Sequence, residues 1–112
     1  MLFSNPFGDF PVIGKNTYIH PSAQIIGKVE IGENCFIGFG AVVFKAVLNE
    51  WTFVGQRAIV QEVEIEKEKF IPEGFVVAKD STLKKLTESQ REFINKVHQM
   101  NRVLAEKYLR TK

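Results

Sequence analysis

The sequence contains few of the side chains that bind metals or carry redox chemistry. Among its 112 residues there is one cysteine, Cys35, and there are two histidines, His20 and His98. A single cysteine excludes an internal disulfide and any metal site of the Cys-x-x-Cys type. We therefore expect no redox function, and we interpret Cys35 as a small packing residue rather than a nucleophile.

Long apolar runs and blocks of like charge are also missing. Residues 1–14 have neither a basic start nor a continuous apolar segment, so they resemble neither a signal peptide nor a membrane span. Residues 81–112 carry eight Lys or Arg against three Asp or Glu, but the basic residues are interspersed with glutamates and apolar positions, which argues against nucleic-acid binding. With 45% apolar and 25% charged residues, residues 1–112 are predicted to form one cytoplasmic domain with no membrane or nucleic-acid partner.

An aliphatic residue recurs every six positions through the first half of the chain. The series slips by one residue after Val43 and then resumes, and a small residue follows most members by four positions. The aliphatic series is Ile13, Ile19, Ile25, Ile31, Ile37, Val43, Leu48, Val54 and Val60. A strand alternates every two residues and a helix repeats every 3.6, so neither element explains a period of six. Internal repetition of this kind indicates a solenoid.

A triangular coil does explain the period. If three six-residue faces make one turn, each face directs one aliphatic side chain to the axis and places its small residue near a corner. Nine repeats then predict a single-stranded parallel β-helix of about three coils over residues 13–70, after an N-terminal segment at 1–12. General rules for parallel crossovers would favour a right-handed coil.

The region after the repeats changes character. Residues 62–70 alternate apolar and charged side chains and are interpreted as a final edge strand. Its acidic residues, spaced by two, favour a solvated charged edge over a divalent-cation site. These residues are Glu62, Glu64, Glu66 and Glu68. Residues 71–80 are predicted to form a turn and a linker.

Residues 81–110 are predicted to form an amphipathic helix that packs alongside the β-helix. Thr87 and Gln90 have the spacing of a capping box. The apolar residues that follow recur at spacings of three and four, which places them on one face of a helix. This face carries Phe93, Val97, Met100, Leu104 and Tyr108.

Four large aromatic residues fall at positions of the repeat that point outward. They are Phe36, Phe39, Phe44 and Phe53. Four such side chains left in water would be unusual on a monomer. We therefore expect the C-terminal helix to cover one face and copies of the same chain to cover another, which predicts a homo-oligomer.

Two segments resemble the γ-class carbonic anhydrases. "YIHPSAQIIGKVEIGENCFIG", residues 18–38, resembles the opening coil of that family, and residues 35–80, with "FIGFGAVVFK" and "IPEGFVV", resemble its closing coils. The resemblance implies a trimer of left-handed β-helices. In the catalytic members, three histidines from two neighbouring subunits bind zinc or iron, and a metal-bound hydroxide attacks carbon dioxide.

The chain departs from this family at the metal ligands. It has no His-x4-His stretch, and Val43-Phe44-Lys45 stands where the family places an Arg-Ser-Asp segment. A solenoid can lose whole turns because each repeat contacts only its neighbours. His20 before Pro21 is interpreted as a turn histidine and only a weak metal candidate, and His98 as an ordinary helix residue.

Three hypotheses follow. The leading one is a trimeric γ-carbonic-anhydrase-like scaffold or regulatory protein with no catalytic residues, no metal and no cofactor. The second is a minimal carbonic anhydrase in which His20 and carboxylates rebuild a zinc or iron site. The third is a hexapeptide acyltransferase, for which about three coils offer little room for the cofactor arm. The sequence specifies no ligand, protein partner or pathway.

Overall fold

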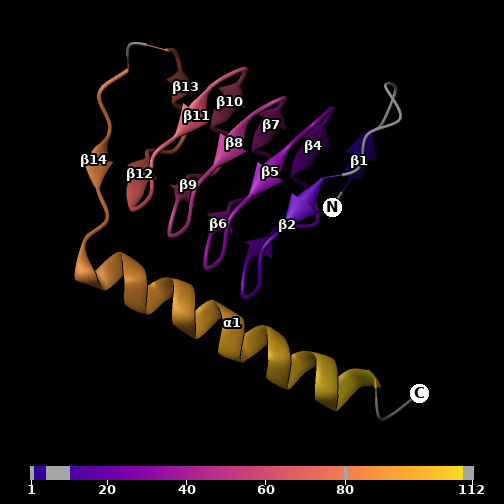
Figure 1. Cartoon of the computed structure of the whole chain (residues 1–112). Helices are drawn as coiled ribbons and strands as arrows, with labels where there is room; N and C mark the ends of the chain where they lie inside the picture. The colour runs from indigo at the N-terminus through magenta and orange to yellow at the C-terminus, as the bar shows by residue number, and fades with distance from the viewer. Residues whose placement is uncertain (1, 5–10, 80, 110–112) are drawn as a thin grey trace.

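Figure 1 shows a stack of short strands with one long helix lying along its side. The computed structural model describes residues 2–4, 11–79 and 81–109, and it describes side chains for residues 11–79, 81–97 and Gln99. The strands form three sheets, which we call A, B and C.

Each sheet takes one strand from every turn of the chain. Sheet A contains β1 (Leu2–Ser4), β4 (Gln24–Ile26), β7 (Val42–Phe44), β10 (Ile59–Gln61) and β13 (Val76–Val77), in that order. Sheet B contains β2 (Val12–Ile13), β5 (Glu30–Ile31), β8 (Val47–Leu48) and β11 (Glu64–Ile65). Sheet C contains β3 (Tyr18–Ile19), β6 (Phe36–Ile37), β9 (Phe53–Val54), β12 (Lys69–Ile71) and β14 (Lys84–Lys85).

Consecutive strands of the solenoid lie in different sheets, and the chain returns to each sheet one turn later. In sheet A, Ile25 pairs with Val43, Val43 with Val60, and Val60 with Val77, all in parallel. This path confirms the predicted parallel β-helix. The prediction of about three coils is corrected to four, because strands β2 to β13 make four complete turns.

The fourth turn was missed because the repeat slips a second time. Gly27 begins a three-residue corner between β4 and β5, whereas Lys45 and Glu62 begin two-residue corners at the equivalent places. Each shortened corner moves the aliphatic series forward by one residue. After Val60 the series therefore continues at Ile65, which pairs with Leu48 in sheet B. All three corner residues have positive φ, between 47° and 75°.

This second slip also corrects the predicted segment boundaries. The expected edge strand at 62–70 is divided between β11 in sheet B and β12 in sheet C. The expected linker at 71–80 contains β13, which is the last strand of sheet A. The β-helix thus extends to Val77, and the segment that leaves it begins after that residue.

The interior of the solenoid is filled by the aliphatic series. Twelve inward positions form three columns, and the members in the middle turns are almost fully buried. Small residues close the corners: Ala23, Ala41, Ala58, Thr52 and Cys35 have no measurable exposure. The Thr52 hydroxyl donates a hydrogen bond of 2.7 Å to the Asn49 carbonyl, so this buried polar group is paired.

Helix α1 (Glu88–Leu109) begins seven residues later than the predicted helix at 81–110. The capping box is present: the Gln90 side chain accepts from the Thr87 backbone N–H, and the Thr87 hydroxyl accepts from the Gln90 N–H. The preceding residues form β14, which pairs antiparallel with β12 and covers the last edge of sheet C. Among the described residues, no helix has the length and hydropathy required for a transmembrane span.

Candidate functional site

The outer face of sheet C carries a ladder of aromatic rings. Tyr18, Phe36, Phe53 and Phe70 occupy the same register in successive strands, and we call them the aromatic ladder. Neighbouring ring centroids are 5.3, 4.6 and 5.4 Å apart. Pairs of this geometry contribute about 0.5–1.5 kcal/mol each beyond the burial of their area.

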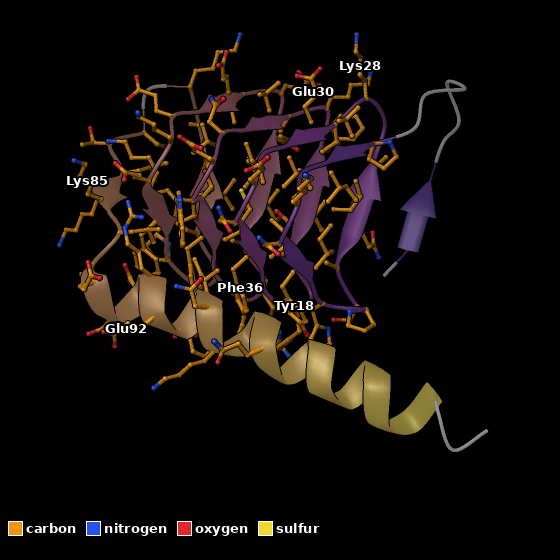
Figure 2. The ribbon with its side chains drawn as sticks, turned by 60° about the horizontal axis from the view of Figure 1, so that its bottom comes forward. Tyr18, Lys28, Glu30, Phe36, Lys85 and Glu92 are labelled. Carbon is orange, nitrogen blue, oxygen red and sulfur yellow. The ribbon has the colours of Figure 1, made fainter. Side chains whose placement is uncertain are left out.

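Helix α1 covers this ladder from one side. The Phe93 ring lies 5.3 Å from Phe36 and 6.0 Å from Phe53, and Ile94 is completely buried. Figure 2 shows Tyr18 and Phe36 on the side of the solenoid along which the helix runs. Of the predicted outward aromatics, Phe36 and Phe53 therefore lie at the helix contact, whereas Phe93 itself keeps 46% of its surface exposed.

The first turns of α1 are also held by charge. Arg91 donates a hydrogen bond to the Glu68 carboxylate, and the Lys85 ammonium lies 3.9 Å from the same carboxylate. The Arg91 guanidinium stacks over the Trp51 ring, 4.6 Å from its centroid. Glu68 lies at the corner between β11 and β12, and not on a common edge with the other glutamates predicted for that strand.

The outer face of sheet A is largely apolar, with Gln24 and Gln61 as exposed polar residues, and has no helix over it in Figure 1. Its five apolar residues, which we call the sheet A patch, are Ile26, Val42, Phe44, Ile59 and Val76. Val76 is 57% exposed and the other four are half-buried. Phe44, predicted as an interface residue, lies in this patch, with the Lys45 ammonium 5.3 Å from its ring centroid.

The fourth predicted aromatic, Phe39, lies at the corner between sheets C and A. It is 38% exposed and packs between the His20 ring at 5.9 Å and the Arg57 guanidinium at 5.8 Å. The predicted interface residues are thus distributed over two faces and a corner, and the structure does not bring them together in one site.

The outer face of sheet B alternates valines with glutamates. Val12, Glu30, Val47 and Glu64 form one outward row, so Val47 separates the two glutamates. Glu66 follows on the same face, and the Asn49 side-chain amide donates to the Glu64 carboxylate at 3.2 Å. Glu62 lies at a corner instead, so the predicted line of four glutamates along one strand is incorrect.

An apolar groove of about 430 Å³ lies beside the ladder. Phe36, Phe53, Phe70 and Phe93 line it, with Gln56 and Glu73 among its polar lining. Gly55 also lines the groove, and a Cβ there would lie 2.5 Å from the Glu73 backbone nitrogen, so this position requires glycine. No histidine is among the described residues that line the groove, so Glu73 is the titratable side chain of its described lining.

His20 is placed as a turn residue. Its ring nitrogen Nδ1 accepts a hydrogen bond of 3.0 Å from the Ser22 backbone N–H, and the Ser22 hydroxyl lies 2.8 Å from the same atom. An accepting Nδ1 places the proton of the neutral ring on Nε2. Metal ligation through Nε2 needs the opposite tautomer, with Nδ1 donating. The surroundings of His20 therefore do not suit a metal ligand.

Among the described side chains, the remaining donors do not complete a zinc or iron centre. Among the residues whose side chains are described, no group of three His, Cys, Asp or Glu converges. Cys35 is buried, and its thiol lies 3.3 Å from the Asn49 carbonyl. Burial raises the pKa of this thiol to about 11, so it remains protonated near neutral pH. The side chain of His98 lies outside the described residues.

Comparison with known proteins agrees with this architecture. Residues 10–45 match the profile of the bacterial transferase hexapeptide family, six repeats. The chain is 32% identical over 92 residues to the carboxysome assembly protein CcmM of Synechocystis sp.. The aligned region covers 80% of this chain and 13% of the relative. The chain is also 32% identical over 76 residues to a carbonic anhydrase of Methanosarcina thermophila, covering 68% of this chain and 31% of the relative.

The chain is a γ-carbonic-anhydrase-like hexapeptide-repeat protein. The resemblance inferred from its sequence is thereby confirmed, and hexapeptide repeats imply that the β-helix is left-handed, as expected. A crystal structure of a hexapeptide transferase family protein from Anaplasma phagocytophilum shares the fold, with a TM-score of 0.53 and 19% identity. The alignment covers 86% of this hexapeptide-repeat protein and 68% of the Anaplasma chain. The protein described here spans less than a third of either curated relative's length.

Several residues of these surfaces were missed by the sequence analysis. Tyr18 and Phe70 complete the aromatic ladder, and each directly precedes an inward aliphatic residue, as Phe36 and Phe53 do. That shared position was a usable signal. The sheet A patch could have been found in the same way, because Val42, Ile59 and Val76 each precede an inward valine.

Proposed function

We propose that this γ-carbonic-anhydrase-like protein is a non-catalytic assembly module. It acts as a trimeric scaffold or regulatory partner and holds no catalytic metal of its own. The observation that carries the proposal is the donor set: His20 accepts at Nδ1 from Ser22, and Cys35 is a buried, protonated thiol. The name of the Synechocystis relative, a carboxysome assembly protein, supports a role in assembly.

The sheet A patch is the surface that we assign to self-association. Sheet C is covered by α1 and the outward row of sheet B alternates valines with glutamates, so sheet A is the most apolar face of the described solenoid that has no helix over it. Contact between this patch and a different face of the next copy is heterologous, and three such contacts close into a ring. Burial of Phe44 and Val76 contributes on the order of 1.5–3 kcal/mol for each side chain that becomes fully buried.

The assembly role follows from the stiffness of the solenoid. Each turn is hydrogen-bonded to the next through three sheets, so the faces keep fixed positions relative to one another. A ring of three such solenoids presents three copies of the sheet B face, with its glutamates, at fixed spacing. A protein partner with basic surface segments fits this face best.

A carbonic anhydrase is the second candidate. The Methanosarcina relative supports it, and a site shared between copies would have to recruit His20 together with donors of another chain. For this the Ser22 contact at Nδ1 would have to break. Carbon dioxide hydration would then depend on His20, and a His20→Ala variant would lose it.

Two measurements on the anaerobically purified protein test the proposal. Light scattering is expected to give three chains of 12.8 kDa, or a multiple of three, and stopped-flow carbon dioxide hydration is expected to equal the buffer rate. A hydration rate well above buffer that is lost in His20→Ala would overturn the non-catalytic role. A mass of one or two chains would overturn the trimer.

A further inference from the structure

Helix α1 is longer than the sheet that it covers. Its 22 residues extend over about 33 Å at about 1.5 Å per residue. Sheet C has five strands, and at about 4.8 Å between neighbours the distance from first to last is about 19 Å. The helix therefore exceeds the width of its sheet by about 14 Å, or roughly nine residues.

The contacts of Phe93 show at which end this excess lies. Phe93 packs on Phe36 of β6 and Phe53 of β9, so the helix crosses these two strands at that residue. The first strand of the sheet, β3, lies about 7 Å further on, which corresponds to roughly five residues of helix. α1 does contact β3. The helix thus passes β3 near residue 98, and in Figures 1 and 2 its C-terminal end lies beyond β2 and β6, about as far along the stack as β1.

The projecting part continues the apolar stripe in the sequence. Met100, Leu104 and Tyr108 continue the three-and-four spacing that begins at Phe93 and Val97. These helical positions share the face that contacts the ladder further back. On these spacings, residues 99–109, which we call the overhang, extend past the first strand of sheet C. An isolated helical segment of this length is marginal in water without packing.

Exposed apolar residues lie at the same end of the solenoid. Val12 in β2 is 63% exposed. Ile13 occupies an inward position and is 36% exposed, whereas its registered partner Ile31 is 2% exposed. β2 and β3 are the terminal strands of sheets B and C in the described chain, whereas β14 covers the opposite edge of sheet C.

We propose that the N-terminal end of the solenoid is a two-fold interface between two copies of this chain, with each overhang packed against the other copy. The overhang and the exposed first turn are separate observations that meet at one end. A two-fold axis there places the second copy's sheet C and helix beyond the first, where each overhang needs a surface. The terminal strands of the two copies then run antiparallel, which is the pairing that β14 already makes with β12.

The surface available to this contact is smaller than a standard interface. Interfaces of standard size use about 20–30 residues on each side. Residues 11–19 and the overhang together number about twenty, and only one face of the overhang can touch the second copy. This interface is independent of the sheet A contact. A threefold ring that also uses the two-fold end would form a hexamer with dihedral symmetry.

Light scattering on three proteins tests the interface. Val12→Asp places a charge at the proposed two-fold contact and is expected to halve the mass of the assembly. Ending the chain after His98 removes the overhang and is expected to give the same halving. Val47→Asp, in the same outward row of sheet B but in the third turn, is the matched control and is expected to leave the mass unchanged. Circular dichroism establishes that each variant is folded.

Cross-linking with a short bis-maleimide provides a second readout. Cys35 is buried, so an introduced cysteine is the reactive one. Val12→Cys is expected to give covalent dimers at dilute protein concentration, and Lys67→Cys, an exposed position, is expected to give none. Unchanged mass in both folded variants, together with no dimer for Val12→Cys, would overturn the interface. A wild-type mass of three chains also contradicts it and leaves the proposed trimer intact, whereas a mass of two chains supports it and contradicts the trimer.

Discussion

The Arg91 guanidinium stacks 4.6 Å from the centroid of the Trp51 ring while it donates to the Glu68 carboxylate. Trp51 and Glu68 lie at the same corner in successive turns, and both have positive φ. One side chain of α1 thus joins the helix to two turns of the solenoid. Because Trp51 is the single tryptophan of the sequence, its fluorescence reports this contact.

Arg91→Ala is expected to lower the free energy of unfolding by about 1–2 kcal/mol, because it removes a cation–π contact and a charge-assisted hydrogen bond. The measurement is urea unfolding followed by Trp51 emission. Lys96→Ala, an exposed position on the same helix, serves as the control and is expected to change stability by less than about 0.5 kcal/mol. Equal stability of the two variants would show that Arg91 does not hold the helix.

Phe36→Ala is expected to destabilise the protein by about 3–5 kcal/mol, since the ring is 8% exposed and touches both ladder neighbours and Phe93. Phe39→Ala is the matched variant at a corner, and it is expected to cost about 1 kcal/mol or less. Thermal or urea unfolding measures both. A smaller loss of stability for Phe36→Ala than for Phe39→Ala would contradict the conclusion that the helix packs on the aromatic ladder.

Val76→Lys is expected to remove the threefold contact, because it introduces a charge into the apolar sheet A patch at a residue that is 57% exposed in the isolated chain. Light scattering is expected to show a mass reduced by a factor of three with an unchanged circular dichroism spectrum. Glu30→Lys, on the outer face of sheet B, is expected to keep the wild-type mass. If Glu30→Lys dissociates the assembly and Val76→Lys does not, the interface lies on sheet B and the assignment to sheet A is incorrect.

The buried thiol predicts a loss of stability at alkaline pH. Burial raises the pKa of Cys35 from 9.0 to about 11, so the unfolded state releases this proton at lower pH than the folded state does. The contribution is therefore fully present below pH 9 and is lost as the pH rises towards 11. Two pKa units correspond to at most about 3 kcal/mol.

Other groups titrate in the same range, so the comparison with Cys35→Ala isolates the effect. The stability difference between the wild type and Cys35→Ala is expected to shrink between pH 9 and 11 in urea unfolding experiments. A difference that stays constant over this range would show that the thiol is not buried as described. Native Cys35 is also expected to resist a thiol reagent at pH 8 until the protein unfolds.

Much of the solenoid could be predicted because its interior imposes a strict period. Every inward position from Ile13 to Val60 was placed correctly, including the first one-residue slip after Val43. The second slip was not recognised, since the alternating charges of residues 62–68 are also typical of an ordinary edge strand. A corner residue with positive φ, such as Glu62, leaves no clear signal in the sequence when it is not glycine or asparagine.

The surfaces were harder to predict than the interior. Outward aromatics could be recognised, but which sheet each one faced depended on the number of residues in each corner. Phe36 and Phe44 therefore lie on different sheets although both were predicted as one interface class. Arg91 contacts Trp51 and Glu68, which lie 40 and 23 positions earlier in the chain. These contacts could not be predicted from the sequence, because they depend on where the helix packs against the solenoid.

The metal content of the anaerobically purified protein tests the central claim most directly. The account predicts far less than one zinc or iron per chain, because the Ser22 N–H occupies Nδ1 of His20 and the described side chains of one chain supply no converging set of donors. One tightly bound metal per chain that disappears in His20→Ala would contradict it.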